Sequence, residues 1–177
     1  MSAVVNAIGV VGLVALLAAL VVAGWLSWTA GRLDRMHLRV DGARAALDAA
    51  LARRRAVAIE LSGGGLADPA SAVLLADAAM QPLDGDRELD RWQRESDLSA
   101  VLRAVAVGRG AASGPSDDAW AELALATERV TMARRIHNDL VGTTLALRGR
   151  RRVRWFRLAG HAPAVAMIAF DDEPPLT

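Results

Sequence analysis

The first 31 residues contain no ionisable side chain, and this feature constrains the chain more than any other. Residues 7–30 form a run of 24 residues, which spans about 36 Å as a helix, whereas a bilayer's hydrocarbon core is about 30 Å thick. A cleaved signal peptide has a basic start and a shorter apolar core, but no Lys or Arg precedes this run. We therefore predict that residues 1–31 form an uncleaved transmembrane anchor, which makes the lipid bilayer the first partner.

The flanks of this segment predict its orientation. No charged side chain precedes it, whereas four arginines follow it closely, at Arg32, Arg35, Arg39 and Arg44. Basic residues near the end of a span stay on the cytoplasmic side, and Trp25 and Trp28 suit the inner headgroup level. We expect a single-pass protein of the cell membrane with its N-terminus outside. The chain has no Cys, which excludes disulfides and agrees with a reducing compartment.

Helical periodicity dominates the rest of the chain. Apolar residues recur at spacings of three and four over residues 33–61, beside a polar stripe that includes Arg55. Glycines 63–65 stop this helix, and Asp68-Pro69 is typical of a helix start. Similar reasoning predicts the remaining helices at 69–80, 86–107 and 117–149.

These elements predict an all-α fold, with one N-terminal transmembrane helix followed by an antiparallel up-and-down helical bundle. Four helices are favoured over three, because Pro82 and Gly85 mark a turn between the second and third. We expect three parts: the anchor 1–31, a cytoplasmic bundle 32–158 and an irregular tail 159–177.

Two helices carry a predicted buried face. The third should turn six residues inward: Leu89, Trp92, Leu98, Val101, Leu102 and Val105. The last helix has a wide apolar arc that includes Arg134 and His137, which predicts at least two packing neighbours. The apolar members of that arc are Leu123, Leu125, Ala126, Val130, Met132, Ala133, Ile136, Leu140, Val141, Leu145 and Leu147.

Two blocks of residues resemble the LemA family. The first comprises Val40, Asp41, Ala43, Leu47, Asp48, Leu51, Arg53 and Arg54. The second comprises Arg129, Val130, Ala133, Arg134, His137, Asn138, Asp139 and Val141, and Gly160-His161 with Phe170-Asp171 resembles the family's closing elements. The resemblance covers residues 33–61 and about 86–171. It implies a membrane-anchored antiparallel bundle in which these residues are structural, and it implies no reaction.

The chain departs from the family pattern at Ile59-Glu60, where a Pro-Asn is usual, and it has no Tyr. It also has no Lys, and its abundant Ala and Gly are typical of a high-GC bacterium. The acids Asp41 and Asp48 are interpreted as partners for arginines of the last helix, with a partner-binding face as the alternative. Arg53 and Arg54 are expected to pack their stems while their guanidinium groups reach carboxylates or water.

Catalytic and metal-binding patterns give no candidate. The three histidines, His37, His137 and His161, have no ligand spacing, so we expect no metal and no cofactor. His137, Asn138 and Asp139 are successive residues, which point about 100° apart on a helix and cannot face one substrate. A core or capping role for His137 is the simpler interpretation.

An arginine-rich cluster follows the last helix. It consists of Arg148, Arg150, Arg151, Arg152, Arg154, Trp155, Phe156 and Arg157. One interpretation is contact with anionic lipid headgroups of the inner leaflet, with the two aromatic rings at the interface. A second is pairing with residues 62–130, where twelve acids and six arginines give a net charge of −6. Docking of an unknown membrane protein partner is a third, and nucleic-acid binding is disfavoured.

The functional prediction is a non-enzymatic scaffold or interaction module at the cytoplasmic face. One alternative is a regulatory subunit of a membrane-associated enzyme, or such an enzyme itself. A second alternative is nucleic-acid binding through the arginine-rich cluster. A convergent polar pocket with strongly perturbed titratable residues would favour an enzyme, and a dry Ala/Leu core would favour the scaffold.

Overall fold

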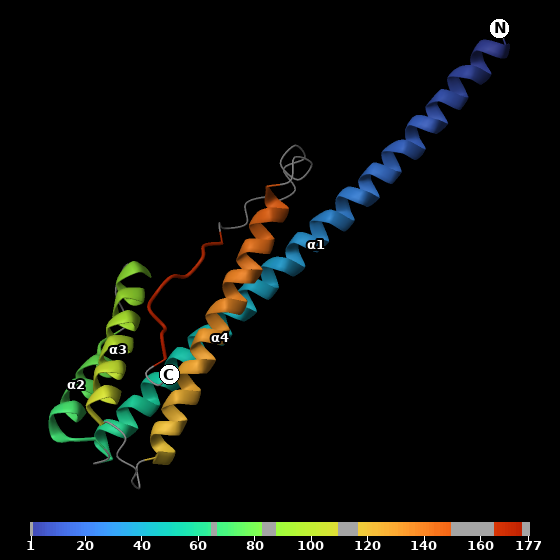
Figure 1. Ribbon diagram of the computed structural model, residues 1–177. Helices are drawn as coiled ribbons and strands as arrows, with labels where there is room; N and C mark the ends of the chain where they lie inside the picture. The colour runs from blue at the N-terminus through green and yellow to red at the C-terminus, as the bar shows by residue number, and fades with distance from the viewer. Residues whose placement is uncertain (1, 65–66, 83–87, 110–116, 150–164, 175–177) are drawn as a thin grey trace. The chain divides into compact units, whose positions relative to one another are not determined.

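The computed structural model describes residues 2–64, 67–82, 88–109, 117–149 and 165–174. These residues form four helices: α1 (Ser2–Gly63), α2 (Pro69–Met80), α3 (Glu88–Arg109) and α4 (Asp117–Arg148) (Figure 1). Residues 165–174 are irregular, and no strand occurs within these ranges. The all-helical prediction is confirmed for the described residues.

The chain divides into two compact units, which are described separately. The first contains residues 1–39 and 142–165, and the second contains residues 40–141 and 166–177. The helices α1 and α4 each contribute residues to both units. The candidate site lies entirely within the second unit.

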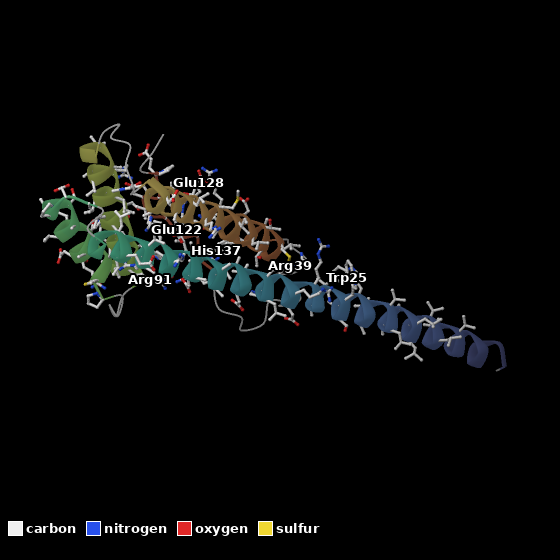
Figure 2. The ribbon with its side chains drawn as sticks, turned by 90° about the horizontal axis from the view of Figure 1, so that it is seen from below. Trp25, Arg39, Arg91, Glu122, Glu128 and His137 are labelled. Atoms are coloured by element: carbon white, nitrogen blue, oxygen red, sulfur yellow. The ribbon has the colours of Figure 1, made fainter. Side chains whose placement is uncertain are left out.

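In the first unit, the apolar N-terminal sequence belongs to α1. Among the described residues, α1 is the one helix long and apolar enough to cross a membrane, judged by length and composition. Trp25 and Arg39 both lie on it (Figure 2). The Arg32 guanidinium carbon lies 6.0 Å from the Trp28 ring centroid, a cation–π contact where the apolar run meets the first charges.

Local signals set the helix ends in the second unit. The α1 helix ends at Gly63, and the Gly64 amide donates to the Glu60 carbonyl oxygen at 2.9 Å. The Asp68 carboxylate caps α2 by accepting hydrogen bonds from the Ala70 and Ser71 amides, both at 3.1 Å. Observed α2 has the predicted bounds 69–80, whereas α3 is displaced by two residues from the predicted 86–107.

The apolar core of the second unit comprises two clusters. The larger joins all four helices, through residues such as Leu61, Leu75, Leu102 and Leu123. The smaller joins α1, α3 and α4 to the C-terminal residues, and its buried members are Leu47, Leu51, Trp92, Val130 and Ile168. Burying one such side chain fully contributes about 1.5–3 kcal/mol, so both clusters hold the unit together.

Two of the predicted buried faces need correction. Leu89 was expected to turn inward but is 78% exposed at the start of α3. On α4, Leu125, Met132 and Ile136 are about half exposed, so the buried arc is narrower than predicted. The reason is that Leu123 and Val130 of α4 pack in the core clusters with residues of α1, whereas Leu125, Met132 and Ile136 belong to neither cluster.

Candidate functional site

The largest group of buried charge is a junction of two arginines with one glutamate. Arg54 Nη2 lies 2.7 Å from Glu95 Oε2, and Arg55 Nε lies 2.9 Å from Glu95 Oε1. The side chains of Arg54 and Glu95 are completely buried. Burying a charge is costly unless it is paired and hydrogen-bonded, and here one carboxylate serves two guanidinium groups. Arg54, Arg55, Glu95 and Ser99 are called the charged junction below.

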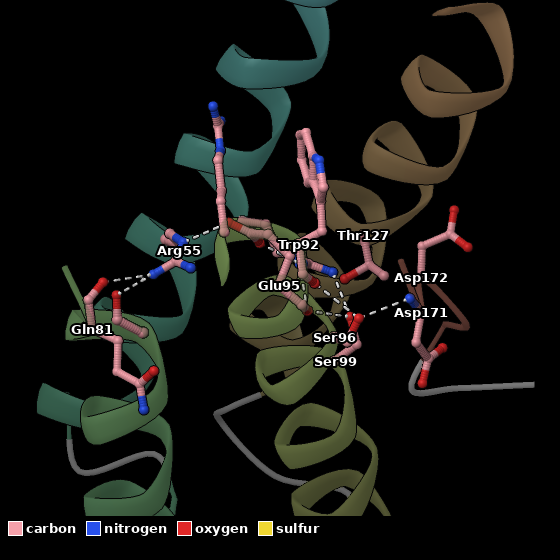
Figure 3. A network of polar contacts seen from close by, with 12 residues as sticks. Arg55, Gln81, Trp92, Glu95, Ser96, Ser99, Thr127, Asp171 and Asp172 are labelled. Atoms are coloured by element: carbon pink, nitrogen blue, oxygen red, sulfur yellow. Dashed lines mark hydrogen bonds and ion pairs between the residues drawn. The ribbon is translucent and has the colours of Figure 1, made fainter. Parts of the chain in front are cut away.

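The charged junction connects three helices. Arg54 Nη1 donates to Ser99 Oγ at 2.9 Å, which adds a second contact between α1 and α3. Arg55 Nη1 donates to the carbonyl oxygens of Ala79 and Gln81, at 3.1 and 3.3 Å (Figure 3). The last carbonyls of a helix have no partner within it and carry partial negative charge, so Arg55 stabilises the end of α2.

Two opposing influences act on Arg54. Burial is the larger influence and lowers the pKa of the Arg54 guanidinium below its ordinary value, while the charge of the adjacent Glu95 and its hydrogen bond act in the opposite direction. Arginine nevertheless keeps its proton in proteins. The junction is therefore an ionised structural contact between helices.

The family-motif residues of α1 divide into core and surface positions. Val40, Leu47 and Leu51 are buried, as is Val141 of α4. Asp41 is exposed, and Asp48 accepts a hydrogen bond from Arg91 Nη2 of α3 at 2.7 Å.

The pairing predicted between acids of α1 and arginines of the last helix is wrong for Asp48. Its arginine partners, Arg91 and Arg44, belong to α3 and α1. The observed ion pair between α1 and α4 has the opposite polarity and joins Arg53 to Glu122. Arginines of α1 thus pair with carboxylates of α3 and α4, in addition to contacts within α1 such as Arg44 with Asp48.

A second polar site holds the C-terminal residues 166–174, called the tail segment below. Arg134 on α4 holds Asp172 through two parallel bonds of 2.8 Å, from Nε to Oδ2 and from Nη2 to Oδ1. On α3, Arg103 holds Asp171, with Nη1 lying 3.0 Å from Oδ1. This side-chain hydrogen bond with Arg103 lowers the pKa of Asp171 below its ordinary value. The two acids are therefore fixed by arginines from two different helices.

The backbone of the tail segment is also recognised. The Asn138 side chain donates from Nδ2 to the Ile168 carbonyl oxygen, and its Oδ1 accepts from the Ile168 amide, both at 2.9 Å. Ser96 Oγ accepts from the Asp171 amide at 3.1 Å (Figure 3), and Thr131 Oγ1 donates to the Asp172 carbonyl oxygen at 3.0 Å. Side chains of α3 and α4 thereby satisfy backbone groups that a sheet would otherwise pair.

Two apolar side chains of the tail segment complete the contact. Ile168 is 2% exposed and packs in the smaller core cluster. The Phe170 ring stacks on Trp92, with centroids 5.5 Å apart and planes 9° from parallel. The guanidinium carbon of Arg134, which belongs to α4, lies 5.7 Å from the Phe170 ring centroid. Six of the helix residues that contact the tail segment are called the tail site below: Trp92, Ser96, Arg103, Thr131, Arg134 and Asn138.

The sequence identified part of this site. The resemblance includes Arg134, Asn138 and Phe170-Asp171, but it predicts no contact between them. The tail 159–177 was predicted as a part separate from the bundle. Ser96, Arg103, Thr131 and Asp172 were missed as contact residues. The sequence signal for this contact was the acidic run Asp171–Glu173, which directly follows an aromatic residue in an Ala-rich stretch and indicates a segment that arginines can bind.

Other predicted site residues have different outcomes. Arg129 is exposed on α4. His137 is 2% exposed, with Nε2 lying 3.4 Å from the Ala166 carbonyl oxygen, so the core role is confirmed. Within the described ranges, no three His, Cys, Asp or Glu side chains form a group suited to a metal ion.

The arginine-rich cluster cannot be compared with the structure. Arg148 closes α4, and its side chain is outside the described set. The other members lie outside the described residues: Arg150, Arg151, Arg152, Arg154, Trp155, Phe156 and Arg157. The interpretations of this cluster stay predictions.

Comparisons with known proteins do not identify the chain. No family model matches it, and no curated protein or solved structure matches it either. The resemblance to the LemA family therefore stays a prediction.

Proposed function

We propose that this protein is a LemA-like, single-pass protein of the cell membrane that acts as a non-enzymatic scaffold or interaction module at the cytoplasmic face. The observation that carries this proposal is that charged side chains in the second unit bind other segments of the chain. Arg54, Arg55 and Glu95 bind one another and the end of α2, and Arg103 and Arg134 bind the tail segment. These groups are engaged in contacts between segments of the chain itself, which supports a structural use of its charged residues over a catalytic one.

The proposal includes an antiparallel up-and-down bundle, and the order of contacts supports it. Along α1, Leu47 clusters with Val130 and the later Arg53 binds the earlier Glu122, as expected for opposite chain directions in α1 and α4. Along α3 the order is reversed, because Asp48 binds Arg91 and the later Arg54 binds the later Ser99. Helices that alternate in direction along the chain produce this pattern.

The membrane assignment has its own support. Residues 1–31 lack ionisable side chains, and a charged residue at the bilayer centre costs about 2.5–3.5 kcal/mol on insertion scales. The first charged positions after this run are Arg32, Asp34 and Arg35. In this proposal the arginine-rich cluster 148–157 contacts anionic lipid headgroups of the inner leaflet, the side on which Arg32 and Arg35 leave the membrane.

Topology is tested with two reporters fused after Thr177 in the full chain. One reporter is active only in the cytoplasm, and the other is active only outside it. We expect activity from the cytoplasmic reporter alone. As a matched control, moving the four flanking arginines to the amino side of the run should reverse the result. Strong activity of the external reporter in the natural chain would overturn the location.

The scaffold role is tested by cross-linking in native membranes, followed by affinity purification and mass spectrometry. The matched control is residues 1–44 fused to an unrelated soluble protein, which keeps the anchor and its basic flank. We expect at least one partner to be recovered with the full chain and absent from the control. If the two samples contain the same proteins, the scaffold proposal is wrong.

A further inference from the structure

The tail segment is held in the way that many proteins hold an extended peptide of another chain. Ile168 is buried, Ala169 is exposed and Phe170 is half-buried, which is the period-two alternation of an extended strand. In peptide recognition, bonds to the main chain supply affinity, and contacts to alternate side chains supply specificity. Both kinds of contact are present in the tail site.

We propose that the tail site is a recognition site for an extended segment of another protein, with the pattern apolar–any–aromatic–acid–acid, and that the chain's own tail segment occupies it. This inference rests on the interaction-module function proposed above and specifies the chemistry of the partner. The tail residues Ile168, Phe170, Asp171 and Asp172 supply the pattern.

The main-chain contacts would accept any residue in an extended conformation. Asn138 binds both the amide and the carbonyl of Ile168, and neither bond depends on the Ile168 side chain. The same is true of Thr131, which binds the Asp172 carbonyl oxygen. A side-chain amide on a helix can therefore set the register of an incoming backbone without a β-sheet edge.

The side-chain contacts select the pattern. Trp92 offers a flat aromatic face for a stacked ring, and it is itself flanked by Arg44 and Arg91 at 4.9 and 5.1 Å. Two arginines then read two successive acids, and Arg134 does so with the two-bond geometry that is specific for a carboxylate. A segment without the acids would leave both guanidinium groups without these partners.

The composition of the tail site favours a ligand that can leave. Ser96, Arg103, Thr131, Arg134 and Asn138 are polar, and each is only partly buried beneath the tail segment. Water can bind these groups when the segment departs, so their desolvation is reversible. Release would expose the side chains of Ile168 and Phe170 and the apolar residues they cover, chiefly Trp92. Phe170 is already partly exposed when bound.

The natural tail acts as a competitor inside the same chain. A tethered segment has an effective concentration on the millimolar scale, so a free peptide of equal quality binds weakly to the natural chain. A partner gains access when its local concentration is high or when the tail segment is weakened. The apparent affinity then rises in proportion to the fraction of open tail sites.

The test uses the full chain in detergent micelles and a fluorescent synthetic peptide of residues 166–174, AMIAFDDEP. The opened chain carries Ile168→Ser and Phe170→Ser, which alter the tail segment and leave the tail site intact. We expect fluorescence anisotropy to show at least about tenfold tighter peptide binding to the opened chain than to the natural chain. A second opened chain, carrying Asp171→Asn and Asp172→Asn, keeps Ile168 in the core if the first one fails to fold.

Matched substitutions locate the binding to the tail site. Adding Asn138→Leu to the opened chain removes two backbone hydrogen bonds and should weaken peptide binding by at least about tenfold. Adding Arg135→Gln, at the exposed neighbour of Arg134, should leave binding unchanged. A peptide with both acids changed to Asn should bind more weakly and with less dependence on salt.

The outcomes separate this inference from the scaffold role. Opened chains that keep their helical circular dichroism but bind no peptide overturn the peptide site, while the scaffold role still depends on the cross-linking result. If light scattering shows that the natural chain forms a dimer that the tail substitutions dissolve, the occupant is a second copy of the chain. That result would also overturn the assignment to another protein.

Discussion

The charged junction and the tail site use the same chemistry, arginine with carboxylate, in different surroundings. In the junction, Arg54 and Glu95 are completely buried. At the tail segment, the Arg103 and Asp171 side chains are 29% and 40% exposed. The Arg134 and Asp172 side chains are 22% and 12% exposed. A buried pair is costly to break because removing one partner leaves an uncompensated charge, whereas an exposed pair is weak and screened by salt. Burial therefore distinguishes a contact that fixes helices from a contact that can be released.

The largest expected effect tests the junction. Glu95→Gln leaves two buried guanidinium groups without a counter-charge, and should destabilise the second unit by about 3–5 kcal/mol. Thermal unfolding of the full chain in micelles, followed by circular dichroism, measures this destabilisation. The matched control is Glu122→Gln, whose carboxylate pairs with the exposed Arg53 and should contribute only about 0–1 kcal/mol. Equal destabilisation in the two variants would contradict the distinction.

The second prediction compares apolar contacts of the two regions. Leu47 and Ile168 belong to the same cluster and are both almost fully buried. Leu47→Ala creates a cavity between helices and should cost about 2–5 kcal/mol. Ile168→Ala should cost less than Leu47→Ala, because the tail segment can detach locally before the helices unfold.

Melting curves of the two variants measure this difference. Trp92 is the stacking partner of Phe170, so its fluorescence shows whether the tail segment detaches before the whole unit unfolds. If Ile168→Ala destabilised the unit as much as Leu47→Ala, the tail segment would be an inseparable part of the core.

The helices themselves were predictable because local chemistry determines them. Gly63 and the Asp68-Pro69 pair end one helix and begin the next, and the structure confirms α2 at the predicted bounds. The periodicity of residues 33–61 correctly placed Val40, Leu47, Leu51 and Leu61 in the core. These signals depend on residues within one or two turns of each other.

The polar contacts were less predictable because they depend on where distant segments meet. Arg55 falls in the polar stripe of α1, yet it is 6% exposed because the end of α2 reaches it with two carbonyl oxygens. A helical wheel of α1 contains no information on the contact between Arg55 and the end of α2. Asn138 and Ile168 are likewise 30 residues apart, and the tail segment has no periodicity that would align them.

The third prediction uses salt to separate the regions. The Debye length falls from about 10 Å at 0.1 M salt to about 3 Å at 1 M, which weakens exposed pairs more than buried ones. Hydrogen exchange at the Ile168 amide, which donates to Asn138, should therefore accelerate several-fold at 1 M sodium chloride. Amides of α3 next to Glu95 should change little. Equal acceleration at both places would indicate that salt acts on the whole unit.

The smallest effect is expected from acid, and its direction follows from Asp171. The hydrogen bond from Arg103 lowers the pKa of Asp171 below its ordinary value of 3.8, so the folded state binds this proton less readily than the unfolded state does. The resulting stabilisation is fully present above about pH 4 and is lost as the pH falls through the folded pKa. Because the pair is partly exposed, solvent screening keeps the contribution small.

In nuclear magnetic resonance spectra, the Asp171 amide, which donates to Ser96, should keep its chemical shift from pH 7 to about 5 and change it below pH 4. Asp171→Asn should remove the effect of this ionisation on the neighbouring Asp172 amide, whereas Glu173→Gln serves as the adjacent acid control and should leave it. If Asp171→Asn leaves the low-pH change intact, Asp172 and Arg134 control acid release of the tail segment, and the Arg103 contact has no part in it.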